Sequence, residues 1–177
     1  VLAYVGEDPA DIIYDLCTNY IPGFDADWID LDAWQTETGT YNGNVYTAYI
    51  TEPTSVKTLL EEMAQQGSLA LWWDDVNDLL RLQVLRAVLT SAFDYTPDSM
   101  RQGTLATREQ LEQRLSQVQI YFGQINPLLP LSNKDNYRSS TIVSDEDAEE
   151  DWGQPAIMTI MSRWIPSSGR TVADRLG

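Results

Sequence analysis

The stretch "GSLALWWDDVNDLLRLQVL", residues 67–85, decides how the first half of the chain is interpreted. Apolar side chains recur at every second position over 69–73 and again over 80–84, which is the pattern of strands with one buried face. The segment "DDVND" between them consists mostly of residues favoured in turns, because Asp and Asn side chains bond to nearby backbone amides. The stretch therefore predicts a β-hairpin with an acidic turn.

The acidic turn contains four side chains that superficially resemble a calcium loop: Asp74, Asp75, Asn77 and Asp78. An EF-hand requires a glycine at its sixth position and a bidentate glutamate at its twelfth. Counted from Asp74, these positions hold Leu79 and Leu85. Counted from Asp75, they hold Leu80 and Arg86. The diagnostic positions do not match, so we interpret the cluster as a hairpin turn.

The composition is that of a globular protein, with 43% hydrophobic residues, six tryptophans and nine tyrosines among 177 residues. This length suffices for one domain with a core or for two small ones. The 27 acidic and 11 basic side chains leave a formal charge of −16. Binding to phosphates or to an anionic membrane needs a basic face, so we expect neither specific nucleic-acid binding nor membrane attachment. The sequence contains no apolar run near the roughly 18 residues of a membrane helix and no signal-peptide pattern.

Histidine is absent from the chain, and Cys17 is its single cysteine. Without histidine the chain cannot form Ser-His-Asp or Cys-His catalytic sites or a His-ligated zinc site. A single cysteine excludes an internal disulfide framework and leaves the compartment open. Glycine-rich phosphate loops and the Walker lysine are also absent. Any chemistry would rest on carboxylates, Tyr, Lys or Ser, and we expect no catalytic, cofactor or metal site.

Residues 1–88 are expected to form one small α+β unit in the order helix, strand, helix, hairpin. Asp8 at a cap position, Pro9 and apolar residues on one face predict a helix over 8–20, with Ile12, Ile13, Leu16 and Tyr20 on that face. Residues 24–39 favour a short helix containing Trp28, Leu31 and Trp34, or a bent extended segment. Asn42-Gly43 predicts a turn, and residues 44–51 have the content of a strand.

The clearest helix of this unit covers "PTSVKTLLEEMAQQG", residues 53–67. Its helical spacing predicts a buried face formed by Val56, Leu59, Leu60, Met63 and Ala64. Lys57 and Glu61 are four residues apart on the outer face, and Gly67 is expected to end the helix.

Residues 89–177 are expected to be mainly β, as part of a sheet or barrel completed elsewhere. Val118, Ile120 and Phe122 alternate on one strand, "AIMTIMSRWI" (156–165) predicts another, and 126–140 is expected to be a loop. The acidic segment 144–152 predicts a solvated helix capped by Ser144 and ended by Trp152-Gly153. The chain starts without Met and stops in what resembles a helix just begun, so we expect it to be a portion of a longer polypeptide.

A second group of carboxylates comprises Asp25, Asp27, Asp30 and Asp32. Hydrolysis by two carboxylates needs a pair at a set separation, which sequence does not reveal. Asp and Ser are preferred at helix N-caps, and we interpret this group as a solvated face in which Asp27 or Asp30 caps a short helix. A cation site in the acidic segment is the alternative to a solvated helix start.

Four tryptophans, Trp72, Trp73, Trp152 and Trp164, are candidate platforms for sugars or anchors at an interface. Neighbours on a strand point to opposite faces, so we expect one ring of the Trp72-Trp73 pair in the core and the other covered by something else. A partner chain is one candidate for that cover. Arg163 beside Trp164 is too small a basic concentration for a nucleic-acid patch.

The order of the elements resembles the α+β insert of tail hub proteins of long-tailed bacteriophages, including baseplate hub and tip attachment proteins. The resemblance rests on "DIIYDLCTNY", a Trp-containing segment, a strand, "SVKTLLEEMAQQG" and the hairpin. The later segments "RLSQVQIYFG" and "AIMTIMSRWIPSSGRTVADRL" resemble hub segments that return to the β-barrel part. The resemblance covers most of the chain and brings no catalytic residues with it.

The resemblance implies a structural protein of the virion tail tip or baseplate. Such proteins form a trimeric ring between the sixfold tail tube and the threefold tip. Their neighbours are the distal tail protein, the tape measure and the receptor-binding or cell-puncturing parts. An acidic ring lining the DNA path would repel phosphates during genome ejection, which would give the charge of −16 a purpose.

Two other functions stay open from the residues alone. The first is a carboxylate-dependent cell-wall glycan hydrolase with Asp27, Asp30 or Asp75 as acid and base. The second is a carbohydrate- or protein-binding module of a tail that uses Trp72 or Trp73 on an exposed face.

Overall fold

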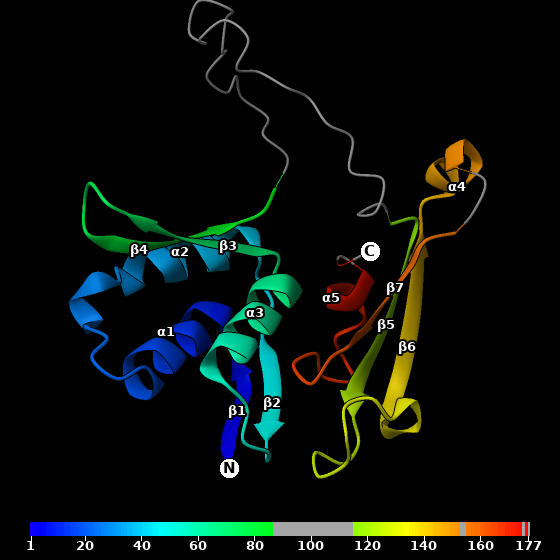
Figure 1. The fold of residues 1–177 in the computed structure, drawn as a ribbon, viewed down its shortest axis with the longest axis horizontal. Coiled ribbons are helices and arrows are strands. Elements are labelled where there is room, and N and C mark those ends of the chain that lie inside the picture. The colour runs from blue at the N-terminus through cyan, green and yellow to red at the C-terminus, as the bar shows by residue number, and fades with distance from the viewer. Residues whose placement is uncertain (87–114, 153–154, 175, 177) are drawn as a thin grey trace, which may run out of the picture.

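The hairpin predicted from residues 67–85 is present. Strand β3 (Leu69–Asp74) pairs antiparallel with β4 (Leu79–Val84), and Leu69 lies opposite Val84. Leu82 and Val84 are buried, and the hairpin packs on helix α2, as Figure 1 shows. The computed structural model describes residues 1–86, 115–152, 155–174 and 176. Over these residues the chain has a mixed α+β fold, as expected.

Helix α1 (Pro9–Tyr20) begins where the sequence predicted. The Asp8 side chain caps it by accepting the Ala10 backbone N–H at 2.8 Å, and the same oxygen accepts the Thr38 hydroxyl at 2.7 Å. Four apolar side chains of the helix are almost completely buried: Ile12, Ile13, Leu16 and Cys17. Tyr20 was expected on this face but is about half exposed, because it lies in the last turn of the helix, beyond the packed part.

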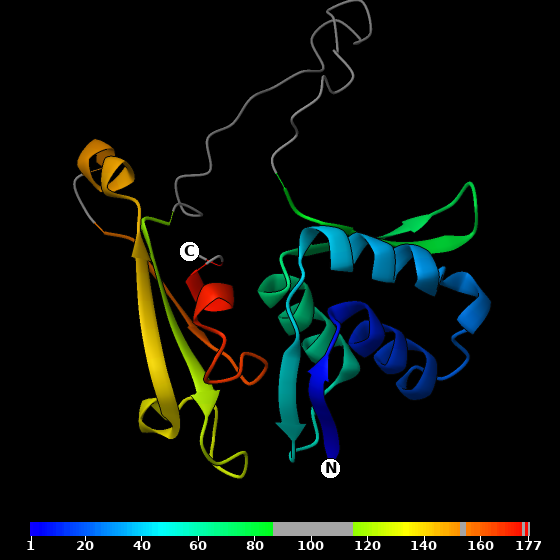
Figure 2. The same cartoon turned by 180° about the vertical axis from the view of Figure 1, so that it is seen from behind.

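Residues 24–41 form two helices in place of one. A 3₁₀ turn, η1 (Ala26–Trp28), is followed by helix α2 (Leu31–Tyr41), and the extended alternative for this segment is wrong. Only Trp34 and Thr38 of α2 are buried, because the helix lies between α1 and the hairpin with its remaining side facing solvent. Figure 2 shows α2 beneath the hairpin from the opposite side.

The first strand, β1 (Leu2–Glu7), was not predicted. It pairs antiparallel with β2 (Tyr46–Ile50), a strand that the sequence did predict. The register shifts between Val5 and Glu7, where Gly6 has a positive φ. The inner face of this ribbon carries buried side chains from both strands: Tyr4, Tyr46, Ala48 and Ile50. The pairing partner is about forty residues away, so the local pattern of β1 alone gave little indication of a strand.

Helix α3 (Val56–Gln66) confirms the best helical prediction. Leu59 and Met63 are buried, and Lys57 Nζ lies 3.7 Å from Glu61 Oε1. Gly67 ends the helix in a right-handed conformation, and the left-handed residue is Ser68 with φ of 51°. The glycine is required because a Cβ there would lie 2.9 Å from the Met63 carbonyl oxygen.

The second part of the structure is a three-stranded sheet in the order β6-β5-β7. Strand β5 (Gln117–Gln124) is central, antiparallel to β6 (Tyr137–Ser144) and parallel to β7 (Ile157–Met161). Val118, Ile120 and Phe122 are buried on one face of β5, as predicted. The prediction of a loop over 126–140 is wrong at its end, because Tyr137–Ser140 belong to β6. The alternation of polar Ser and Arg there conceals the strand.

Three short helical segments accompany the sheet: η4 (Lys134–Asn136), α4 (Glu146–Trp152) and α5 (Arg170–Asp174). The acidic helix was predicted, but Ser144 is the last residue of β6 and Asp145 directly precedes the helix. Gly153, expected to end α4, lies outside the described residues. Helix α5 packs between the sheet and the α+β part (Figures 1 and 2), where Asp174 accepts the Thr141 hydroxyl at 2.8 Å.

One apolar core joins the two parts. Trp164, fully buried, lies with its ring centroid 5.8 Å from that of Tyr4. The described strands form three small sheets, and none of these closes into a barrel. The division at residue 88 lies outside the described residues and stays a prediction. None of the described helices combines the length and apolar character needed to cross a bilayer.

Candidate functional site

The acidic hairpin turn is organised around Asp74. Its carboxylate accepts the backbone N–H groups of Val76 at 3.1 Å and Asn77 at 3.3 Å, the Asn77 side-chain amide at 2.8 Å and Arg81 Nε at 3.1 Å. These bonds, the Asn77 side chain first and then Arg81, lower the pKa of Asp74 to about 2. Asp78, in the left-handed conformation with φ of 52°, completes the turn. A carboxyl group held ionised in this way serves as a structural acceptor and not as a proton donor at neutral pH.

The carboxylates of residues 25–32 cap helices. Asp25 caps η1 by accepting the Asp27 backbone N–H at 3.0 Å, and Asp30 caps α2 by accepting the Ala33 N–H at 3.1 Å. The capping role predicted for Asp30 is confirmed. The alternative cap, Asp27, is wrong, because Asp25 caps the shorter helix. Asp27 and Asp32 are exposed in the first turns of these helices, where negative charge is favourable.

The acidic segment is linked to the edge of the sheet through one side chain. Glu149 of α4 accepts the Gln117 side-chain amide at 2.5 Å and lies 3.4 Å from the Ser116 hydroxyl. Asp145, Glu146, Asp147 and Glu150 are exposed. Among the described residues, no group of three or more Cys, Asp or Glu side chains is arranged to hold a metal ion.

The tryptophans are placed differently from the prediction. Neither ring of the adjacent pair is in the core, since Trp72 is 45% and Trp73 42% exposed. Trp73 is partly covered by Trp28, whose ring meets it edge to face at 5.7 Å between centroids. The hairpin lies at the surface, and the end of it that carries Trp73 extends beyond α2. Trp73 therefore contacts η1 and does not enter the core. Trp164 is a core residue, and the side chain of Trp152 lies outside the described residues.

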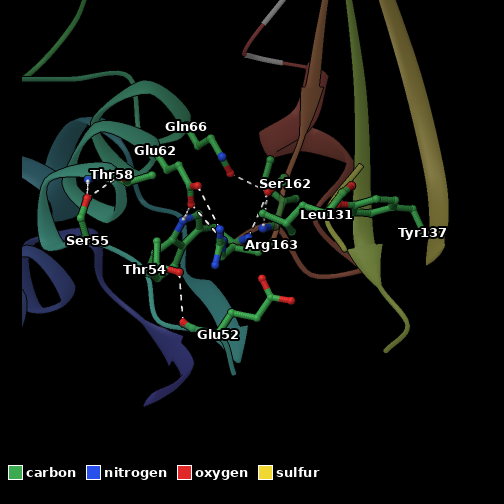
Figure 3. A network of polar contacts seen from close by, with 12 residues as sticks. Glu52, Thr54, Ser55, Thr58, Glu62, Gln66, Leu131, Tyr137, Ser162 and Arg163 are labelled. Carbon is green, nitrogen blue, oxygen red and sulfur yellow. Dashed lines mark hydrogen bonds and ion pairs between the residues drawn. The ribbon is translucent and has the colours of Figure 1, made fainter. Parts of the chain in front are cut away.

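A polar network links α3 to the segment after β7, drawn in Figure 3 and called the joint below. Glu62 Oε1 accepts Arg163 Nη2 at 3.2 Å, and Glu62 Oε2 accepts the Trp164 indole N–H at 3.0 Å. Arg163 Nε also lies 3.0 Å from Oε2, although this contact is an ion pair without a directed hydrogen bond. Both charged side chains are largely buried, Arg163 at 11% and Glu62 at 23% exposed.

Ser162 forms the second half of the joint. Its hydroxyl donates to Gln66 Oε1 at 2.5 Å and accepts the backbone N–H groups of Trp164 and Ile165 at 3.1 and 2.9 Å. The Thr47 N–H of β2 adds a bond to the Trp164 carbonyl oxygen at 2.8 Å. The joint thus satisfies buried polar groups from three segments far apart in the sequence.

Two of the clefts in the described part of the chain lie beside the joint. A cleft of about 260 Å³ lies between β2, the end of β5 and the segment after β7, and its wall includes Arg138, Arg163, Gln124, Thr47 and Ser167. Another, of about 130 Å³, lies beside Asn42 and Gln66. Neither wall contains a carboxylate, so Asp27, Asp30 and Asp75 do not line them. Burial raises the pKa of nearby Tyr137 to about 12, and its hydroxyl donates to the Leu131 carbonyl at 2.9 Å.

No protein-family model matches this chain, and no curated protein matches it.

Glu62, Gln66 and Ser162 were not singled out from the sequence. Glu62 and Gln66 are four residues apart on α3, and Gln66 continues the buried row of Leu59 and Met63. A glutamine at such a position indicates a buried polar contact, because a buried amide needs partners. The partner itself is 96 residues away, beyond what local spacing reveals.

Proposed function

We propose that this chain is a structural component of a phage tail tip or baseplate hub, in which copies of it form an oligomeric ring between tail tube and tip. The order of α1, β2, α3 and the β3–β4 hairpin agrees with the α+β insert that the sequence resembles. In this proposal the joint around Glu62 fixes the insert on the strands that return to the barrel part. The proposed role is non-catalytic.

The observation that carries the proposal is the uncovered face of the three-stranded sheet. One face buries Val118, Ile120 and Phe122 in the core. The opposite face carries Ile142, which is 59% exposed, and Ile157, which is 58% exposed. Lys134 of η4 lies over the Tyr121 ring at one end of this face, 5.4 Å from the ring centre. No described helix packs across the rest of the face in either view (Figures 1 and 2). Apolar side chains left uncovered on a sheet are typical of surfaces buried in assemblies.

The proposed ring also gives the negative charge a role. Glu146, Asp147 and Glu150 of α4 and the four aspartates of residues 25–32 are exposed, and the chain as a whole carries −16. In a hub, an acidic inner surface would keep the genome from adhering while it passes. By the same proposal, the ring adjoins the distal tail protein, the tape measure and the receptor-binding or tip proteins, and it is located in the virion tail.

The native mass of the purified full-length protein, measured by light scattering, tests the ring. We expect three times the monomer mass, and we expect the protein in isolated tail tips. Ile142→Lys should shift the mass toward the monomer, because the ring would bury this lysine between copies without a partner for its charge. Val76→Lys, an equally charged change at the exposed hairpin turn, should leave the mass unchanged. A stable monomer that is also absent from purified tail tips would overturn the proposal.

A further inference from the structure

Three aromatic rings form a row across the surface between η1 and the hairpin: Phe24, Trp28 and Trp73. Phe24 meets Trp28 edge to face at 5.2 Å between centroids, and Trp28 meets Trp73 in the same way at 5.7 Å. Trp28 is 37% and Trp73 42% exposed. The parallel bridge between Ile29 and Leu80 ties the two segments together directly beside the rings. The aromatic row is therefore a fixed surface feature with two accessible indoles.

Aspartates flank this row along the chain, and neither of the two segments that carry the rings contributes an unpaired cation. Asp25 and Asp27 belong to the turn that carries Trp28, while Asp75 and Asp78 follow the strand that carries Trp73; all four are exposed. The segment 21–41 contains no Lys or Arg, and Arg81 of the hairpin is already paired with Asp74. The surface thus combines exposed rings with unbalanced negative charge.

These two properties select the chemistry of a partner. A cation over an indole is attracted by the negative face of the ring, and carboxylates beside it add to that attraction. A neutral apolar partner would remove water from the four carboxylates without compensating their charge. Arginine suits the surface better than lysine, because its planar guanidinium stacks on rings and pairs with carboxylates at once.

The chain already contains this combination once. The Arg86 guanidinium lies 3.7 Å from the centre of the Tyr41 ring and forms an ion pair with Glu37. One aromatic ring and one carboxylate thus hold an arginine after β4. The aromatic row offers the same groups in larger number, without an arginine of the described residues on them.

We infer that the aromatic row and its flanking carboxylates dock an arginine-containing segment of a partner protein. This interaction goes beyond the proposed hub function and does not rest on it, since it requires only the monomer surface. The rings supply the contact area and the carboxylates supply the preference for a cation.

Fluorescence anisotropy with a labelled peptide of alternating Arg and Gly tests the inference on the full chain. Trp28→Ala and Trp73→Ala should each weaken binding about five- to tenfold, the range for loss of a cation–π contact. Trp72→Ala is the matched control, because Trp72 is equally exposed on the opposite face of the same strand. Its affinity for the peptide should equal that of the unchanged protein.

A charge pair provides a test that leaves the rings intact. Asp25→Asn with Asp27→Asn should weaken binding several-fold and reduce its salt dependence, while the Asn at 25 can still cap η1. Glu146→Gln with Asp147→Asn makes the same charge change on α4 and should have no effect. Equal losses for both double variants, or equal losses for Trp72→Ala and Trp73→Ala, would show nonspecific attraction and overturn the inference. Equal binding of a peptide with Gln in place of Arg would also overturn it.

Discussion

The Trp164 indole donates a hydrogen bond to Glu62 Oε2 at 3.0 Å across 102 residues of sequence. The same carboxylate pairs with Arg163, so one side chain of α3 holds two consecutive residues of the segment after β7. This relationship makes Glu62 the polar centre of the joint between the α+β part and the sheet.

Replacing Glu62 should destabilise the protein strongly. Glu62→Ala leaves Arg163 buried without its counter-charge and the Trp164 indole without an acceptor, and we expect a loss of about 3 kcal/mol in unfolding free energy. Glu62→Gln can keep the bond to Trp164 and should lose less. Urea unfolding gives both values. Glu61→Ala, which removes only the exposed pair with Lys57, should change stability by less than about 1 kcal/mol. Equal effects at both positions would contradict the role of Glu62.

Two glycines are expected to respond in opposite directions to alanine. Gly123 has φ of +71°, and a Cβ there would lie 2.9 Å from Ser167 Cα. Gly123→Ala should therefore cost about 1–3 kcal/mol. Gly39 is in α2 with nothing within 4 Å of the added Cβ, so Gly39→Ala should stabilise by about 0.5–1 kcal/mol. Thermal unfolding of both variants shows whether each change raises or lowers stability. Stabilisation by Gly123→Ala would contradict the close approach to Ser167.

Asp74 should contribute to the loss of stability in acid. Its pKa is about 2 in the folded protein, below the ordinary value of 3.8, because the Asn77 side chain and Arg81 favour the ionised form. A lowered folded-state pKa contributes stability that is complete above about pH 4 and is lost as the pH falls through about 2. Asp74→Asn should therefore flatten the dependence of unfolding free energy on pH in this window. Asp75→Asn, at an exposed neighbour in the same turn, should not flatten it.

Cys17 should be inert toward thiol reagents in the folded protein. The thiol is 2% exposed, and burial raises its pKa to about 11, so little thiolate exists at pH 8. Reaction with a chromogenic disulfide should be slow at pH 8 and should accelerate with denaturant in step with unfolding. Fast reaction without denaturant would show that α1 opens locally.

The parts of the fold that could be predicted are those with a local cause. The hairpin and α3 follow from alternation, helical spacing and turn residues within about fifteen positions. Strand β1 was missed because its partner β2 lies beyond a helical pair, and β6 was missed because Ser and Arg conceal its alternation. The prediction that one ring of the Trp72-Trp73 pair lies in the core was wrong for a related reason. Alternation along a strand predicts the face on which a side chain lies, but it does not predict which element covers that face.

The joint could not be predicted at all from local spacing. Glu62 resembles any solvated residue of an amphipathic helix, and Arg163 has no acidic neighbour along the chain. Only the folded arrangement brings them together, because a long-range ion pair leaves no periodic signal in the sequence. The place of Gln66 in a buried row of α3 is a local signal of a polar contact, but it does not identify the partner.

Ser162 gives the joint a further property, because its hydroxyl serves α3 and the segment after β7 at the same time. Separating these segments would break the Ser162 bond to Gln66 and the bonds of Glu62 to Arg163 and Trp164, and it would expose the shared apolar core to water. We therefore expect the two parts to unfold in one cooperative transition. The α+β part and the sheet are thus two architectural pieces that share one core.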